Sequence, residues 1–345
     1  MEGNGLAGEA SSNDPWFVRN ETVIDSRPQE VVHGERTVMA ISLTILAVIF
    51  VLGSVGNIMV CLVISMYSQM RTVFNILVLN LAVIDLFLCV IVAPTYAARI
   101  IFDIIGVQAD DDDGITVVCH ISAFTHYVCT AQSLMTMIQM GIIRVVAVCM
   151  SSKRRRFRIS KIVPCVLIAL NYVASLTYAA FAYTRGTYTL CLDLKMRASV
   201  AHRLSSLATL VIILILISMC YIWIFISTRK QSASNAAVHP EFSKVQRPNR
   251  FDVATAKTLL LVVGTYVVGY IPYVVFISLW AAGLVEDNAR YMTIFPALTS
   301  LCSVANPIIY THNSAVFRRQ LRRLLRRVCP PYKTDISPPG PLPAR

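Results

Sequence analysis

Apolar residues dominate the 345-residue chain: hydrophobic types make up 56% of it, charged types only 14%, and the mean hydropathy is +0.62. This composition excludes a soluble globular protein, which has no use for so much apolar surface. The net charge of +12 comes from Lys and Arg clustered beside apolar segments. It therefore indicates orientation in a membrane, and not a surface that binds nucleic acid.

Seven apolar segments are long enough to cross a bilayer, which takes about 20 residues in a helix. Because lipid offers no partner to backbone N–H and C=O groups, we expect each segment to be a helix. The predicted fold is an all-α membrane protein, a seven-transmembrane helix bundle, and the sequence lacks the internal repeat of common transporter folds. The segments are expected near 38–66, 74–101, 117–150, 161–183, 203–228, 254–282 and 290–311.

The basic residues predict the orientation of the bundle. With the N-terminus outside, the cytoplasmic segments hold 21 of the 31 basic residues and 3 of the 19 acidic ones, as the positive-inside rule requires. Residues 1–37 then form an extracellular tail at the plasma membrane, with a glycosylation sequon at Asn20. The tail lacks a basic stretch followed by a short apolar one, which argues against a cleaved signal peptide.

The C-terminal segments follow a transmembrane domain that we place at residues 38–312. Residues 313–328 interleave apolar and basic residues at helical spacing, which predicts a short amphipathic eighth helix on the anionic inner leaflet. Cys329, directly after it, is a candidate for S-palmitoylation. The Pro-rich residues 329–345 are expected to be disordered in the cytoplasm.

Two of the ten cysteines are predicted on the outer side, in an oxidising compartment. Cys119 opens the third segment and Cys191 precedes the fifth, so a disulfide between them could tie that loop to the third helix. Four aspartates, Asp110 to Asp113, precede Cys119. They form either a solvated loop or an attractor for a cationic ligand or calcium.

Polar groups within the apolar segments indicate where the functional site lies. Asp85 is in the middle of the second segment, where an ionised carboxylate costs about 2.5–3.5 kcal/mol on insertion scales. It must be neutralised, paired with a cation or solvated in a cavity, so a functional role is the default interpretation. Pro94 is expected to kink the outer end of the same helix, and Pro272 to form a hinge in the sixth.

The third segment is predicted to be the central helix of the bundle. The 24 residues between Cys119 and Arg144 are mostly apolar, with His, Thr, Ser and Gln spread around the helix, and such groups face other helices or a cavity. In the fifth segment Ser205 and Thr209 share a helical face. They could hydrogen-bond a ligand or the backbone of their own helix.

In their order and spacing these features resemble the rhodopsin-like (class A) G-protein-coupled receptors over about residues 38–328. The resemblance implies a ligand pocket that opens outward and a heterotrimeric G protein bound to the inner face. The residues that carry it are Gly56-Asn57, Leu81-Ala82-Val83-Ile84-Asp85, Cys119, Arg144, Tyr221, Pro272, Asn306-Pro307-Ile308-Ile309-Tyr310 and Phe317-Arg318.

The resemblance makes Arg144 the pivot of activation, which two acids restrain in many members of the family. Ile143 precedes Arg144 and Val145 follows it, so the usual acid-Arg-Tyr triplet is absent. Asp252 lies 20 residues before Pro272, where the second acid would stand. We hypothesise an Arg144–Asp252 ion pair as the main inactive-state restraint, and the loss of the other restraint should raise basal activity.

The resemblance also implies a bound sodium ion. Asp85, Ser133, Ser303 and Asn306 match the family's pattern and supply the oxygen ligands that a hard cation prefers, although Cys302 replaces a frequent asparagine. A proton is the alternative partner of Asp85. No other cofactor is expected.

The pocket is expected to be neutral and partly aromatic, which favours a small neutral or acidic ligand. His126 stands where biogenic-amine receptors carry Asp, so an amine would have no anchor; His126 is either neutral and hydrogen-bonded or titrates near physiological pH. Arg197 and Arg203 near the mouth could receive a carboxylate. The expected lining residues are His126, Tyr127, Thr130, Ser205, Thr209, Tyr270, Tyr273 and Ser300.

The residues expected to transmit the signal depart from the family's pattern. Tyr270 and Tyr266 replace its helix-six tryptophan and phenylalanine, and Ile213 replaces its helix-five proline. Within the family, the alternative to a small-ligand receptor is therefore an orphan receptor with high basal activity or a peptide ligand, which the acidic outer face would attract.

Two further classes of protein lie outside the family. A transporter or channel would need a continuous polar path. Apart from residues near the segment ends, the only charged residues in the predicted second and third segments are Asp85 and Arg144. An enzyme is rejected, because His120 and His126 are six residues apart, off one helical face, and neither HxxxH nor HExxH occurs.

Overall fold

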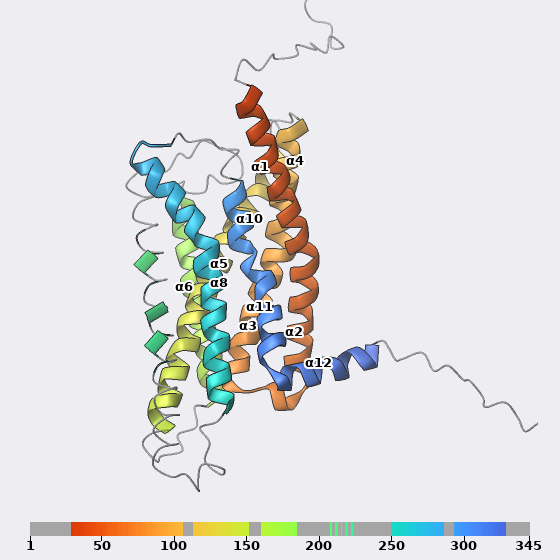
Figure 1. Ribbon diagram of the computed structural model, residues 1–345, viewed down its shortest axis with the longest axis vertical. Helices are drawn as coiled ribbons and strands as arrows, with labels where there is room; N and C mark the ends of the chain where they lie inside the picture. Colours follow the sequence, from red (N-terminus) through yellow and green to blue (C-terminus); the bar gives the residue numbers. More distant parts are fainter. Residues whose placement is uncertain are drawn as a thin grey trace, which may run out of the picture.

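The computed structural model describes residues 29–105, 113–151, 160–184, 250–285 and 293–328, together with isolated positions between 208 and 226. Throughout these residues the regular elements are helices, and five of the helices are long and apolar enough to cross a membrane. Figure 1 shows them side by side in one bundle. The predicted all-α membrane fold is confirmed.

The first span is one long helix that contains a π-helical turn. It consists of α1 (Gln29–Val48), η1 (Ile49–Gly53) and α2 (Ser54–Met66). It begins at Gln29, nine residues before the predicted start at 38. The apolar pattern marks where lipid begins, whereas the helix extends further toward its N-terminus through a polar stretch, in which His33, Arg36 and Thr37 are exposed and Glu35 is buried.

The second span also contains a π-helical turn, and Pro94 accounts for it. The span consists of α3 (Val73–Phe87), η3 (Leu88–Val92) and α4 (Ala93–Ile105). It ends four residues after the predicted end at 101. Proline lacks a backbone N–H and its ring crowds the carbonyl four residues earlier, which is Val90 here. The wider turn η3 contains Val90, so the irregularity expected at Pro94 takes the form of a π turn.

Glycines let the first span approach its neighbours closely. A Cβ on Gly53 would overlap Cys89 Sγ on η3, and a Cβ on Gly56 would lie 2.9 Å from two ring carbons of Pro307. The two π turns η1 and η3 therefore pack against each other through a glycine and a cysteine. Small residues at such contacts are typical of membrane helices.

The third span, α5 (Asp113–Ser151), is the central helix, as predicted. It packs against α3, η3, α4 and α6 (Ile162–Thr184). Polar bonds join three of these helices: Asn80 Nδ2 donates to Thr136 Oγ1 at 2.9 Å, and Ser175 Oγ donates to Gln132 Oε1 at 3.2 Å. These interior polar residues of α5 thus face other helices, which supply the hydrogen-bond partners that lipid lacks.

The sixth and seventh spans complete the part of the bundle that the structure describes. They are α8 (Arg250–Ala281), with Pro272 inside it, and α10 (Ile294–Ser300) followed by α11 (Cys302–Asn313), with Pro307 inside it. The fifth predicted span falls in a stretch of which only isolated positions are described, and these are helical.

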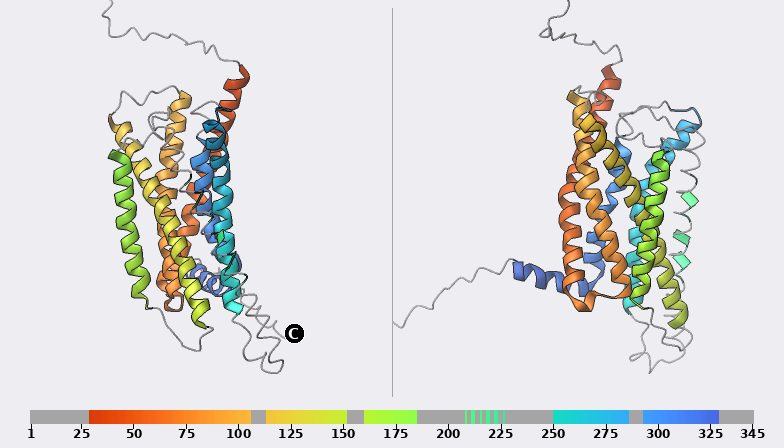
Figure 2. Two further views of the ribbon diagram at one scale, coloured as in Figure 1. Left: turned by 90° about the vertical axis from the view of Figure 1, so that its left-hand side faces the viewer. Right: turned by 180° about the vertical axis from the view of Figure 1, so that it is seen from behind.

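The eighth helix, α12 (Ala315–Val328), projects sideways from the end of the bundle opposite the start of α1 (Figure 2), which is the inner end in the predicted topology. Phe317 and Leu324 are buried on its inner side, and Gln320 Nε2 donates to Gln69 Oε1 at 3.3 Å. Arg318 Nη1 donates to the carbonyl of Thr311 at 3.1 Å and so satisfies the C-terminal end of α11. This arrangement agrees with the predicted amphipathic helix.

Candidate functional site

Asp85 lies at the centre of the bundle, where its side chain is fully buried. Its Oδ1 accepts a hydrogen bond from Ser303 Oγ at 2.8 Å, and its Oδ2 accepts one from Asn306 Nδ2 at 2.8 Å. Both donors are on α11, three residues apart and so on one helical face. The carboxylate therefore joins the second span to the seventh.

The surroundings of Asp85 are rich in oxygen. Asn57 Nδ2 donates to the carbonyls of Gly53 and Ser303, both at 2.9 Å. Three buried side-chain oxygens have no hydrogen-bond partner: Asn57 Oδ1, Ser133 Oγ and Asn306 Oδ1. Among the described residues no cationic side chain pairs with Asp85. Oxygens of this kind fit a hard cation.

Directly outward of Asp85 lies a small cavity that joins two sets of predicted residues. About 10 Å³ is open to a water-sized sphere, which is room for roughly one water molecule or ion. Four of the predicted pocket residues, His126, Thr130, Tyr270 and Ser300, meet the predicted cation ligands Ser133 and Ser303 here. Its lining residues are Leu88, His126, Thr130, Ser133, Tyr266, Tyr270, Thr299, Ser300 and Ser303.

Two hydrogen bonds between α4 and α5 lie at the outer end of this cavity. The Tyr96 hydroxyl is hydrogen-bonded to His126 Nδ1 at 2.8 Å, and the two rings meet edge to face with centroids 5.6 Å apart. The hydroxyls of Thr95 and Ser122 are also hydrogen-bonded. These two contacts join the second span to the third at residues one helical turn apart on α5, Ser122 and His126. His126 is thus hydrogen-bonded.

The family comparison agrees with this geometry. The model of the 7 transmembrane receptor (rhodopsin family) matches residues 56–310, which include Asp85, His126 and the whole cavity. The chain belongs to this receptor family. It is therefore a multi-pass membrane protein.

Two relatives share about a quarter of their aligned residues with the receptor. It is 24% identical over 268 residues to the G-protein coupled receptor GRL101 of Lymnaea stagnalis, covering 74% of this chain and 23% of the relative. It is 24% identical over 317 residues to Melanopsin-A of Danio rerio, covering 85% of this chain and 50% of the relative. The chain thus spans a quarter to a half of the length of these relatives.

At its inner end the receptor is apolar where many members carry an acid. Ile143, directly before Arg144, is buried in a cluster with Met140, Leu77 and Tyr310, and Val145 packs against the same cluster. An unpaired carboxylate at position 143 would have to be buried among these side chains, at a high cost. The apolar residue at position 143 thus fits its apolar surroundings.

Several predicted residues lie apart from the small cavity or outside the described part of the receptor. Tyr127 lies beside His126, with ring centroids 6.5 Å apart, and Tyr273 packs edge to face on Phe295 at 5.7 Å. The side chains of Cys119, Arg144 and Asp252 are outside the described set, although their backbones belong to α5 and α8. The predicted residues wholly outside it are Asn20, Asp110, Asp111, Asp112, Cys191, Arg197, Arg203, Ser205, Thr209, Ile213, Tyr221 and Cys329.

The sequence prediction did not include Tyr96, Thr95 or Thr299 in the site. Tyr96 and Thr95 were detectable as a polar pair just after Pro94 in an apolar helix. Thr299 has no comparable signal in the sequence. In the structure its hydroxyl donates to the carbonyls of Phe295 and Pro296 in its own helix.

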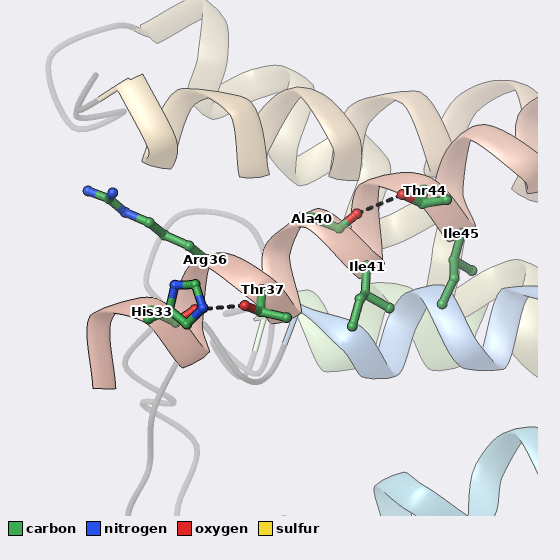
Figure 3. Close-up of a pocket in the computed structure, with 7 residues that line it drawn as sticks. All are labelled: His33, Arg36, Thr37, Ala40, Ile41, Thr44 and Ile45. Atoms are coloured by element: carbon green, nitrogen blue, oxygen red, sulfur yellow. Dashed lines mark hydrogen bonds between the residues drawn. The ribbon is translucent and has the colours of Figure 1, made fainter. Parts of the chain in front are cut away.

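A larger hollow lies along the outer half of α1 (Figure 3). The hydroxyls of Thr37 and Thr44 both bond carbonyls of α1 itself, those of His33 and Ala40. The described lining comes from this one helix, so no polar groups of different helices converge on it. The residues along it are His33, Arg36, Thr37, Ala40, Ile41, Thr44 and Ile45.

Proposed function

We propose that the receptor transmits an extracellular signal to a heterotrimeric G protein, and that its ligand is a small neutral or acidic molecule. The observation that carries this proposal is the cavity between His126 and Ser303. It connects the residues expected to contact a ligand with the serine that bonds Asp85. A change at the outer end therefore has a direct route to the joint between α3 and α11.

The size of the cavity supports a mechanism in which the ligand shifts a conformational equilibrium. A space of about 10 Å³ holds roughly one water molecule, so a ligand that reaches Tyr266 and Tyr270 must displace them. Both tyrosines are on α8, which also carries Pro272. A ligand that binds only the displaced arrangement favours a different position of α8.

Sodium at Asp85 would stabilise the unliganded arrangement. Asp85, Ser133, Ser303 and Asn306 would hold the ion, whose charge would compensate the buried carboxylate. These residues belong to α3, α5 and α11, so the ion would link three helices. A proton on Asp85 is the alternative, since it would remove the buried charge instead.

At the inner face we propose that Arg144 binds the G protein in the active state and pairs with Asp252 in the inactive state. Tyr221, Asn306, Pro307 and Tyr310 would take part in the transition between them. Tyr310 is buried in the apolar cluster of the inner end.

The rest of the proposed topology follows the charge distribution. The N-terminus would be outside the plasma membrane, with a glycan at Asn20 and a disulfide between Cys119 and Cys191. Cys329 would carry a palmitoyl group beside α12. The six arginines of α12, which has no acidic residue, favour contact with anionic lipids of the inner leaflet.

A constitutively active receptor is the second candidate, and the burial of Ile143 favours it. Because Ile143 replaces an acid, Arg144 has lost one of the two restraints that many relatives possess. Both candidates predict G-protein coupling, and they differ in the signal without ligand.

Ligand-free signalling in cells tests the proposal and separates the two candidates. Wild type, Arg144→Ala and Asp252→Asn are compared at matched surface expression. A wild-type signal that disappears in Arg144→Ala and rises in Asp252→Asn is the expected result for a receptor with one remaining restraint. Unchanged signalling in Asp252→Asn contradicts the ion pair, and a wild-type signal that survives in Arg144→Ala contradicts the role of Arg144.

A further inference from the structure

Arg99 stands one helical turn outward from the residues that tie α4 to α5. It follows Tyr96 by three positions and Thr95 by four, so it shares a helical face with both. Tyr96 and Thr95 bond His126 and Ser122 of α5. In Figure 1, α4 reaches the end of the bundle opposite α12, beside α1. Arg99 therefore lies at the outer approach to the cavity.

One donor of the Arg99 guanidinium is unsatisfied. Its Nε is buried and has no hydrogen-bond partner. A buried N–H donor without an acceptor is costly, more so on a charged group.

The unpaired atom also indicates which ligand chemistry would satisfy Arg99. Nε–H and one terminal N–H form a planar fork that matches the two oxygens of a carboxylate. A neutral ligand oxygen would satisfy one donor and leave the charge uncompensated. Arg99 is thus suited to a singly charged planar anion.

The space inward of Arg99 limits where the rest of such a ligand can lie. The cavity below His126 holds roughly one water molecule, so it cannot hold the body of such a ligand in this arrangement. The rings of Tyr96 and Tyr127 lie beside His126. This environment suits an apolar or aromatic body.

We propose that Arg99 binds the anionic group of the receptor's ligand, which is an apolar monocarboxylate whose body lies against Tyr96 and Tyr127. This inference rests on the proposed function of the cavity as a ligand site. It assigns the charged contact to the second span, within the described bundle. The carboxylate enters from outside, and opening of the Tyr96–His126 hydrogen bond lets its body approach the cavity.

The competing explanation is that Arg99 serves Asp103, which lies one turn further outward on α4. An arginine and an aspartate four residues apart on a helix are neighbours. If neutralising Asp103 were the role of Arg99, removing either charge would affect binding in the same way. Asp103→Asn is therefore the matched control for Arg99→Gln.

The test measures thermal stabilisation of the purified full-length receptor by decanoate and indole-3-acetate, each beside its primary amide. We expect the acids to stabilise wild type and the amides to have no effect. In Arg99→Gln the apparent affinity for the acids should fall roughly 10- to 100-fold, the loss of hydrogen bonds to a charged group. Arg99→Lys should lie between the two, and Asp103→Asn should respond as wild type does.

Four results would overturn the proposal: no stabilisation of wild type by either acid, equal stabilisation by the amides, an unchanged response in Arg99→Gln, or an equal loss in Asp103→Asn. Melting temperatures without ligand show whether each variant is folded. Ligand-free signalling needs no carboxylate. If the receptor couples to a G protein in the signalling assay but the acids do not stabilise it, only the proposed ligand class is rejected. Stabilisation by the acids without any signalling rejects the proposed transduction and retains the binding site.

Discussion

Asp85→Asn separates the structural role of Asp85 from its proposed role in binding a cation. The asparagine has the same shape but one acceptor oxygen in place of two. Asn306 Nδ2 can donate to that oxygen, and the Ser303 hydroxyl can turn and accept from the new amide, because a hydroxyl both donates and accepts. Both contacts between α3 and α11 are therefore retained.

The magnitudes follow from these contacts. Each of the two hydrogen bonds changes from about 1.5–3 kcal/mol, typical of a charged acceptor, to about 0.5–1.5 kcal/mol. The variant no longer buries a carboxylate, and this gain offsets the loss, so we expect a sodium-free stability close to that of wild type. Sodium at ten times its Kd would stabilise wild type by about 1.4 kcal/mol, and it should leave the variant unchanged.

The assay is the melting temperature of purified receptor in sodium chloride and in choline chloride at the same ionic strength. Asn80→Ala is the control, because Asn80 is also buried on α3 but bonds Thr136. It should lower the melting temperature and keep the sodium response. An equal sodium response in wild type and Asp85→Asn refutes the site at Asp85. A wild type that responds to acid and not to sodium supports the proton instead.

Two further predictions concern packing and the outer hydrogen bonds. Gly53→Ala forces Cys89 to move and should lower the free energy of unfolding by about 1–3 kcal/mol. Adding Cys89→Ala should restore most of this loss. Gly264→Ala, whose new Cβ would meet no atom within 4 Å, should be neutral or stabilising in thermal unfolding. Tyr96→Phe removes the hydrogen bond to His126 and should lower stability by about 0.5–1.5 kcal/mol. A double-mutant cycle with His126→Ala measures that coupling, and fully additive losses would contradict a direct bond.

The central polar site could be predicted from the sequence because its members occur at fixed spacings within helices. Ser303 and Asn306 are three residues apart on α11 and necessarily share a face, and a buried Asp85 requires such donors. Their hydrogen bonds to Asp85 agree with that expectation. The central place of α5 followed in the same way from its interior polar residues, which lipid cannot satisfy.

Other features could not be predicted, because they depend on which helices meet and at what height. The bond between Tyr96 and His126 joins residues 30 positions apart, and no spacing within one helix reveals it. The contact of Gly53 with Cys89 depends on two π turns, η1 and η3, that lie at the same depth. Only η3 is followed by a proline, Pro94, from which an irregular turn could be predicted. Helix ends were also missed, since polar residues continue α1 outward from its apolar start.

The positions of polar and apolar residues limit how a ligand and a cation can affect the inner face. In the outer half of the described bundle, hydrogen bonds at Thr95, Tyr96 and Asp85 join the helices beside one apolar cluster. A second apolar cluster, around Met140 and Ile143, lies in the inner half. The helix α11 belongs to both halves, with Ser303 and Asn306 bonded to Asp85 and Tyr310 in the cluster. A ligand that enlarges the cavity and a cation that holds Ser303 would therefore act on the same helix. By linkage, the factor by which sodium changes the affinity for such a ligand must equal the factor by which the ligand changes the affinity for sodium. A factor of one in both directions would mean that the two molecules do not act on one equilibrium of α11.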